Sequence, residues 1–228
     1  MSKEEARKKT VQEIYENLML KDLGFKYFKA KNYFERKSNG FSFTIGFNSS
    51  RVNILENTNI LIVTAGVSHE KFAEWQKDKL GRYPSGLIGS GKIKNLFTPG
   101  PPYIDFDIQE NEAKRQEVIA EISSILKSNV FDFFEICIDK NRIIENVNLP
   151  CFSISSIIQY FKFIGNEQDI SIFFEKKAES FSEIKDQINY YSDRLKHTPS
   201  GTSFPETFTD ASKLSALQIA ETMIRIGN

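Results

Sequence analysis

The chain has 228 residues, of which 40 % are hydrophobic and 26 % charged, so it has the composition of a globular protein with a hydrophobic core. Its 30 basic and 30 acidic side chains balance, so the formal net charge is zero. This argues against a protein whose whole surface binds nucleic acid. With no apolar run of roughly 18 residues, no apolar leader and only two cysteines, we expect a cytoplasmic protein without a membrane partner or a disulfide framework.

The first segment has the features of a helix. Ser2 and Glu5 have capping-box spacing, and apolar residues then recur at helical intervals to about Met19. Gly24 stands where a helix-ending glycine is expected. We therefore predict an N-terminal helix that lays one face on the segment that follows.

A group of short strands is predicted next. Aromatic runs at 25–28 and 32–37 precede the Asn-Gly pair at 39–40, which is typical of a two-residue hairpin turn. Residues 41–47 alternate between apolar and polar types, as an antiparallel strand with one buried face does. Residues 60–67 are rich in β-branched types, which favours a central strand.

The middle of the chain mixes helices with a glycine-rich and proline-rich stretch. We predict a helix from 68 or 69 to about 79, and a loop over 81–103 whose unusual length suggests a function. Residues 103–108 alternate like a strand. A helix over 111–128, capped by Asp107 or Glu110, is predicted to follow.

The second half is predicted to be mainly helical. Residues 129–146 are compatible with either helix or strand, and helices are expected over 153–163 and 169–180. Further helices are expected after the capping-box pair Ser180 and Glu183 and after Asp210.

These elements together indicate an α+β fold, in which an N-terminal helix packs on a largely antiparallel sheet and a helical C-terminal part follows. We place the first domain at residues 1–148 and a helical subdomain at 149–228.

Residues 86–92 match the G-x-x-x-x-G-K spacing of a phosphate-binding loop. Ile93 replaces the Ser or Thr that would hold Mg²⁺, no apolar strand precedes the match, and Pro99 comes too early for the helix that would hold an anion. We interpret the segment as a flexible loop, with a mobile anion-binding loop as the alternative.

Other catalytic or metal-binding patterns are weak. Cys137 and Cys151 stand among apolar neighbours, which favours inert buried thiols, and a Cys151–His197 dyad rests on residue type alone. Asp105 and Asp107 share a strand face, where a solvated edge or helix cap is commoner than an acid–base pair. We therefore predict no catalytic residue, metal or cofactor.

Charge is segregated locally, since basic residues dominate 71–94 and acidic residues dominate 105–121. The two blocks either pair with each other or form an interface of both signs that steers a partner protein. In an alternative hypothesis, a small anionic ligand binds between the sheet and the 81–103 loop. Across the two hypotheses, the candidate binding residues are Arg36, Arg51, Trp75, Arg82, Tyr83, Lys92 and Lys94.

Several short motifs, taken in order, resemble a known family. They are Leu23-Gly24-Phe25-Lys26, Tyr33-Phe34-Glu35-Arg36, the strand end Phe47-Asn48-Ser49-Ser50 and the helix end from Trp75 to Leu80-Gly81. Over about residues 5–145, this order is similar to the bacterial family known as domain of unknown function 4304. Asn48 stands where that family usually has Gln, and Lys79 where it usually has Arg.

The resemblance implies a binding role, as in small accessory or immunity-type proteins, more than a reaction. Our leading hypothesis is a non-catalytic protein-binding module of the immunity-like or antitoxin-like kind. The alternative is an enzyme or sensor with a small anionic-ligand pocket.

Overall fold

The computed structural model describes residues 2–50, 59–80, 85–100, 105–108, 111–165, 167–176, 185–196 and 219–220. The chain divides into two compact units. The first unit consists of Met1–Ser68, Gly89–Asp139 and Leu149–Cys151, and the second of His69–Ile88, Lys140–Asn148 and Phe152–Asn228.

Helix α1 (Lys3–Asn17) begins as predicted but ends earlier. The Ser2 hydroxyl accepts from the Glu5 backbone N–H at 3.2 Å, and the Glu5 carboxylate accepts from the Ser2 N–H at 2.7 Å, so the capping box is confirmed. The predicted end at Gly24 is wrong, because Met19, with φ 47°, already takes the left-handed conformation that terminates a helix.

The first unit is built on an antiparallel sheet, and the predicted α+β fold is confirmed. Its strands lie in the order β1 (Lys26–Phe28), β2 (Tyr33–Ser38), β3 (Phe41–Ser49), β4 (Ile60–His69) and β5 (Leu87–Lys92), and β6 (Phe106–Asp107) pairs with β4. A short 3-10 turn, η1 (Lys29–Lys31), joins β1 to β2. Asn39 and Gly40 have φ values of 51° and 82°, as the predicted two-residue hairpin turn requires.

One face of the sheet forms the core of the first unit. The predicted alternation along β3 is confirmed, because Phe43, Ile45 and Phe47 are buried. Tyr15 of α1 meets Phe34 of β2 at 5.1 Å between ring centroids. The helices therefore lie on the face that carries these apolar side chains.

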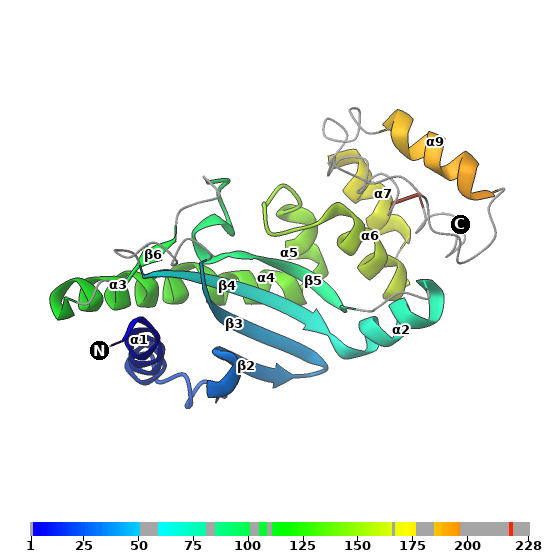
Figure 1. Ribbon diagram of the computed structural model, residues 1–228. Coiled ribbons are helices and arrows are strands. Elements are labelled where there is room, and N and C mark those ends of the chain that lie inside the picture. The colour runs from blue at the N-terminus through cyan, green and yellow to red at the C-terminus, as the bar shows by residue number, and fades with distance from the viewer. Residues whose placement is uncertain are drawn as a thin grey trace. The chain divides into compact units, whose positions relative to one another are not determined.

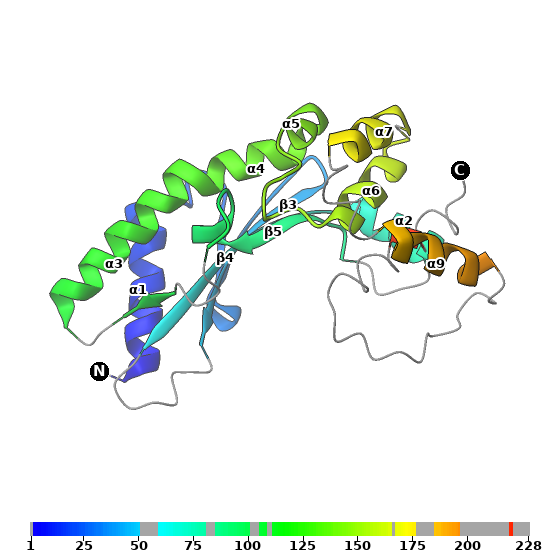
Figure 2. The ribbon, with the colours of Figure 1, turned by 90° about the horizontal axis from the view of Figure 1, so that it is seen from above.

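A long helical rod covers the same face, as Figures 1 and 2 show. It consists of α3 (Glu112–Ile125), the π-helical turn η4 (Leu126–Val130) and α4 (Phe131–Ile138). Phe134 of α4 reaches Phe43 at 5.3 Å between ring centroids. Helix α3 is capped by Asn111, whose side chain accepts from the Ala113 N–H, so the predicted cap at Asp107 is wrong; Glu110 lies outside the described residues.

The predicted 81–103 loop is wrong over residues 87–95, which form β5 and the 3-10 turn η3 (Ile93–Asn95). The His69 N–H donates to the Gly86 carbonyl at 2.9 Å, and a Cβ at Gly86 would lie 2.5 Å from the His69 carbonyl oxygen. A Cβ at Gly91 would crowd Leu96 at 3.3 Å. Gly86, just before β5, and Gly91, within β5, thus permit close approaches to neighbouring atoms.

Apart from the ends of β4 and β5, the described part of the second unit is mainly helical. Its helices are α2 (Glu70–Leu80), α5 (Lys140–Glu145), α6 (Ile154–Phe163), α7 (Glu167–Lys176) and α9 (Lys185–Lys196). The predicted helices at 68–79 and 153–163 are confirmed. Within the segment 129–146, which was compatible with helix or strand, α4 and α5 are helical and the extended Asp139 separates them. The predicted caps at Ser180 and Asp210 lie outside the described residues.

Candidate functional site

A cleft with a volume of about 590 Å³ lies between the N-terminal half of α1 and the segment from β1 to the end of η1. We call it the α1–β1 cleft; it is lined by Glu4, Lys8, Lys9, Gln12, Tyr27, Lys29, Ala30 and Asn32. A smaller cavity of about 120 Å³, the inner pocket, shares Glu4, Lys8 and Asn32 with it. The size of the cleft is in the range of ligand-binding sites.

Local structure explains why these side chains meet. Glu4, Lys8 and Gln12 follow one another at four-residue spacing, so they lie on one face of α1. Asn32 ends η1 in the left-handed conformation, with φ 50°, which asparagine tolerates better than most residues. The helix and the η1 turn thus supply opposite walls of the cleft.

The α1–β1 cleft is predominantly cationic, with three lysines against one glutamate. Lys8 Nζ lies 2.6 Å from Glu4, and both side chains are more than half exposed. Lys29 Nζ lies 5.9 Å from the centre of the Tyr27 ring, and burial raises the pKa of Tyr27. Because exposed ion pairs contribute about 0–1 kcal/mol, Lys8 can exchange Glu4 for a ligand carboxylate at little cost.

Asn32 lies at the junction of the cleft and the inner pocket. Its backbone carbonyl accepts from the Phe47 N–H at 2.9 Å. Its side-chain Oδ1 is buried and has no hydrogen-bond partner among the described residues. Since buried polar atoms are nearly always hydrogen-bonded, this unpaired oxygen costs free energy of folding.

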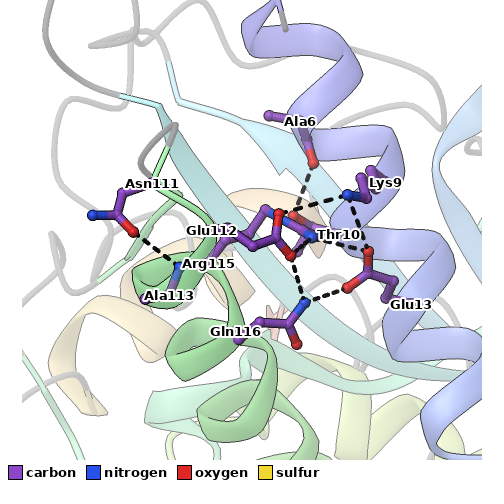
Figure 3. Close-up of polar contacts among 9 residues, drawn as sticks. All are labelled: Ala6, Lys9, Thr10, Glu13, Asn111, Glu112, Ala113, Arg115 and Gln116. Carbon is purple, nitrogen blue, oxygen red and sulfur yellow. Dashed lines mark hydrogen bonds and ion pairs between the residues drawn. The ribbon is translucent and has the colours of Figure 1, made fainter.

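A charged cluster joins α1 to α3 beside the cleft (Figure 3). Arg115 is fully buried, and its Nη2 donates to Glu13 at 3.0 Å and to Glu112. Gln116 donates to both carboxylates, at 2.8 and 3.0 Å. Lys9, which also lines the cleft, lies 3.5 Å from Glu112 and 3.9 Å from Glu13.

The cluster shifts the titration of its carboxylates. Hydrogen bonds from Gln116 and Arg115 lower the pKa of Glu112 to about 2. For Glu13, partial burial works in the opposite direction, but hydrogen bonds from Arg115 and Gln116 outweigh it and lower the pKa. Both groups are therefore ionised at neutral pH.

Asn59 fixes the start of α1 on the sheet. Its buried side chain accepts from Arg7 Nη1 at 2.9 Å and donates to the Lys3 carbonyl at 3.1 Å. Its backbone N–H donates to Asp107 of β6 at 3.2 Å. These contacts hold the helix face that carries the cleft residues.

The predicted binding lysines are engaged within the first unit. Lys92 Nζ lies 2.8 Å from Asp105, and Lys94 Nζ lies 2.7 Å from Glu121 and 4.1 Å from the centre of the Phe106 ring. The basic and acidic blocks therefore pair with each other at these positions, which is the first of the two alternatives read from the sequence.

Of the remaining predicted site residues, the structure describes Arg36 and Trp75. The Arg36 guanidinium lies over the rings of Phe25 and Phe43, at 5.3 and 4.5 Å, and β3 and β4 separate its strand from that of Lys92. Trp75 belongs to the second unit. Arg51, Arg82 and Tyr83 lie outside the described residues.

Sequence reasoning overlooked the cleft and the charged cluster. No sequence motif marks the cleft, because residues 4–12 and 27–32 meet only in the fold. The position of Arg115 is visible in the sequence pattern. It precedes Ile119 and Ile122, on the buried face of α3, by four and seven residues. A charged residue in line with such a stripe indicates a buried ion pair.

Both cysteines are buried, as predicted. Burial raises the pKa of Cys151 to about 12 and also raises that of Cys137, which suppresses their thiolates. Within the described ranges, no group of three or more metal-ligating side chains occurs. The helices described there include none with the length and apolarity to cross a bilayer.

Comparison with known families supplies the assignment. A family model described as Domain of unknown function (DUF4304) matches residues 17–136, which is more than half of the chain. The chain belongs to this family. The predicted resemblance is thereby confirmed. No curated protein and no solved structure matched the chain.

The DUF4304 segment contains the six strands of the described sheet and most of the α3–α4 rod. It therefore includes Tyr27, Lys29 and Asn32 on one wall of the cleft. The α1 wall, with Glu4, Lys8 and Gln12, precedes the matched segment. The cleft thus combines a family element with residues outside the match.

Proposed function

We propose that the chain is a cytoplasmic protein-binding module that takes an acidic segment of a partner protein in the α1–β1 cleft. The observation that carries the proposal is the charge of the cleft lining, in which Lys8 and Lys29 meet one carboxylate, Glu4. The third lysine, Lys9, lies near Glu112 and Glu13. Such a role needs no catalysis and suits an immunity-like inhibitor. A cationic cleft also speeds the encounter with an acidic partner.

Two features favour side-chain recognition over the addition of a strand. The Phe25 N–H, just before the edge strand β1, donates to the Leu20 carbonyl at 2.9 Å, and the Phe25 carbonyl accepts from the Tyr15 hydroxyl at 2.7 Å. This part of the sheet edge is therefore already closed. Lys8 and Lys29 stand on opposite walls of the cleft, so carboxylates of one extended segment can meet both.

The proposal is tested with a fluorescein-labelled glutamate-rich peptide and a lysine-rich peptide of equal length. We compare wild type with Lys8→Gln/Lys29→Gln, which spares Lys9 and its contacts with the Arg115 cluster. The control Lys37→Gln/Lys114→Gln removes the same charge from exposed positions outside the residues that line the cleft.

Of the two peptides, we expect only the acidic one to bind wild type. Its affinity should fall about tenfold in the Lys8/Lys29 double variant and stay unchanged in the control variant. Equal losses in the two double variants, or no binding by wild type, would contradict the proposal. If free glutarate displaces the acidic peptide at a concentration equal to that of the peptide, the result favours the alternative function, binding of a small anionic ligand.

A further inference from the structure

The sheet of the first unit has a second face, opposite the one on which α1 and the α3–α4 rod lie (Figures 1 and 2). The strand register shows which side chains it carries. Tyr27 pairs with the buried Phe34, so the next pair along the two strands, Phe28 and Tyr33, lies on the opposite side. We call the side of the sheet that carries Phe28 and Tyr33 the outer face.

Two aromatic rings stand on the outer face as a stacked pair. The ring centroids of Phe28 and Tyr33 lie 4.8 Å apart, and the ring planes differ by 10°. Phe28 is 38 % exposed, and Tyr33 is half-buried. The register partner of Tyr33 on β3 is Gly46, so no side chain of that residue continues the stack. The pair therefore offers ring surface on which another planar ring can stack.

Polar side chains surround the position of Gly46. A Cβ built there would lie 2.9 Å from Thr64 Oγ1 and 3.8 Å from Asn48 Nδ2. Neither of these side chains has a hydrogen-bond partner among the described residues. A hydroxyl and a carboxamide both donate and accept hydrogen bonds, so they can bind the polar groups of a ligand that stacks on Tyr33.

The stretch that carries the aromatic pair is basic. Residues 26–37 contain five basic side chains and one acidic side chain. Lys26 and Lys37 share the outer face with the rings by the alternation of β1 and β2, and Lys31 lies in η1 between these strands. All three lysines are exposed, and no ion pair or side-chain hydrogen bond engages them in the described part of the chain.

We propose that the outer face binds single-stranded RNA, with a base stacked on the Phe28–Tyr33 pair and phosphates paired with the exposed lysines beside it. Lysines alone suit any polyanion and rings alone suit many flat ligands, but a nucleic-acid strand carries rings and phosphates together. A single strand is required, because the bases of a duplex are already stacked on one another.

The polar groups beside the aromatic pair favour ribose over deoxyribose. Thr64 and Asn48 can hydrogen-bond the 2′-hydroxyl, the group that distinguishes RNA from DNA. The balanced charge of the whole chain is compatible with this site, because the basic stretch is local. The RNA site is also separate from the α1–β1 cleft, since Phe28 and Tyr33 lie on the other side of the sheet from α1.

The test measures fluorescence anisotropy of a fluorescein-labelled oligouridylate of about ten nucleotides, a length that single-strand binding surfaces cover. Phe28→Leu/Tyr33→Leu keeps apolar side chains but removes both rings. We expect its affinity to fall about tenfold, because the stacked base is lost. The control Tyr190→Leu, at an exposed ring of α9, should bind as wild type does. Circular dichroism verifies that each variant folds.

A second pair of variants tests the phosphate contacts. Lys26→Gln/Lys37→Gln removes two charges from the outer face, and Lys114→Gln/Lys127→Gln removes two from exposed positions on the α3–α4 rod. We expect the slope of log affinity against log salt concentration to become shallower by about 1.4 in the first variant, at roughly 0.7 for each lost phosphate contact. The slope of the second variant should match that of wild type.

The same measurements can overturn the proposal. No binding by wild type, unchanged affinity in the Phe28/Tyr33 variant, or an equal change of slope in the two lysine variants would each do so. Equal affinity for the matching oligodeoxyuridylate would overturn the assignment to RNA. Equal displacement by a glutamate-rich peptide would show that the surface recognises charge alone, and would overturn it too.

The cleft variant separates this site from the proposed function. Lys8→Gln/Lys29→Gln should lose the acidic peptide and keep the RNA. If it loses RNA as strongly as the outer-face lysine variant does, the strand lies in the α1–β1 cleft and the outer-face site is overturned. Failure of the acidic peptide to bind wild type overturns the proposed function and leaves the RNA site standing.

Discussion

Two helix–helix junctions, one in each unit, are built from opposite chemistry. In the first unit, α1 meets α3 through the buried Arg115 and its carboxylate partners. In the second unit, α2 meets α6 through aromatic rings: Phe72 lies 5.5 Å from Tyr160 and from Phe163, and Trp75 lies 6.1 Å from Phe163. The first junction is made of charged groups and the second of aromatic rings.

The two chemistries stabilise a junction to different degrees. Burying a guanidinium costs desolvation energy, which the contacts with Glu13 and Glu112 offset, so the net gain is small. Arg115 Nε and Nη1 also lack partners in the described part of the chain. Aromatic rings gain free energy from buried area and from tilted and edge-to-face contacts without a comparable cost.

The comparison suggests a division of roles. The charged junction fixes which helix faces meet, because an arginine with two carboxylates accepts few other arrangements. The aromatic junction supplies more stability and includes one polar contact, in which Gln76 donates to Gln159 at 2.8 Å. Substitutions at the two junctions separate the contribution of charge from that of buried side-chain volume.

The largest expected effect is that of Phe72→Ala. Phe72 is fully buried at the centre of the aromatic junction, so we expect a loss of about 3–5 kcal/mol in the free energy of unfolding. Urea unfolding followed by the fluorescence of Trp75, the single tryptophan, measures it. Tyr190→Ala, at a ring that is 55 % exposed, is the control and should stay within about 0.5 kcal/mol of wild type.

At the charged junction, size should matter more than charge. Arg115→Ala removes a fully buried side chain, and we expect a loss of about 2–5 kcal/mol in unfolding followed by circular dichroism. Arg115→Met fills most of the same space without a buried charge, so its loss should stay below about 1.5 kcal/mol. Equal losses in the two variants would show that the ion pairs themselves supply the stability.

Local patterns in the sequence were sufficient for much of the fold. The capping box at Ser2, the Asn39-Gly40 turn and the alternation along β3 are each decided by residues close together in the chain. The 81–103 segment was misread because Gly86 and Gly91, which indicate a loop in isolation, serve the packing of β5 against distant residues.

The candidate site was beyond the same kind of reasoning. Its walls come from residues 4–12 and 27–32, two segments that share no motif and meet only in the fold. For Lys92 and Lys94, the charge blocks leave pairing and a partner interface open, and the fold shows the contacts with Asp105 and Glu121.

Acid should weaken the charged junction more than the aromatic one. The pKa values of Glu13 and Glu112 are lowered from 4.5 in the folded protein, to about 2 for Glu112. The unfolded chain therefore binds protons at higher pH, so this stabilisation is complete above about pH 4.5 and is lost as pH falls through the folded values.

The measurement compares wild type with Arg115→Met in urea unfolding between about pH 5 and pH 2.5. Other carboxylates contribute in both proteins, so the difference between the two pH profiles isolates the cluster. We expect wild type to lose more stability than the variant over this interval. Parallel profiles would show that Arg115 does not set the pKa of these carboxylates.

The smallest expected effect concerns His69, at the start of α2. Its Nδ1 accepts from the Phe72 backbone N–H at 3.3 Å, and burial, aided by the charge of Lys71, lowers its pKa below 6.5. The unfolded chain thus takes up this proton at higher pH than the folded one. The stabilisation is complete above about pH 6.5 and declines as the pH falls through the folded pKa.

The pH effect on His69 is measured in thermal unfolding followed by Trp75 fluorescence. Lowering the pH from about 7.5 to 5.5 should reduce the midpoint by less than about 4 °C, the shift that 1 kcal/mol causes at this chain length. His69→Asn retains a capping acceptor that does not titrate, so its midpoint should change less over the same interval. If the midpoint changes equally in wild type and in His69→Asn, a group other than His69 causes the pH effect. The stability of the aromatic junction then does not depend on the charge of His69.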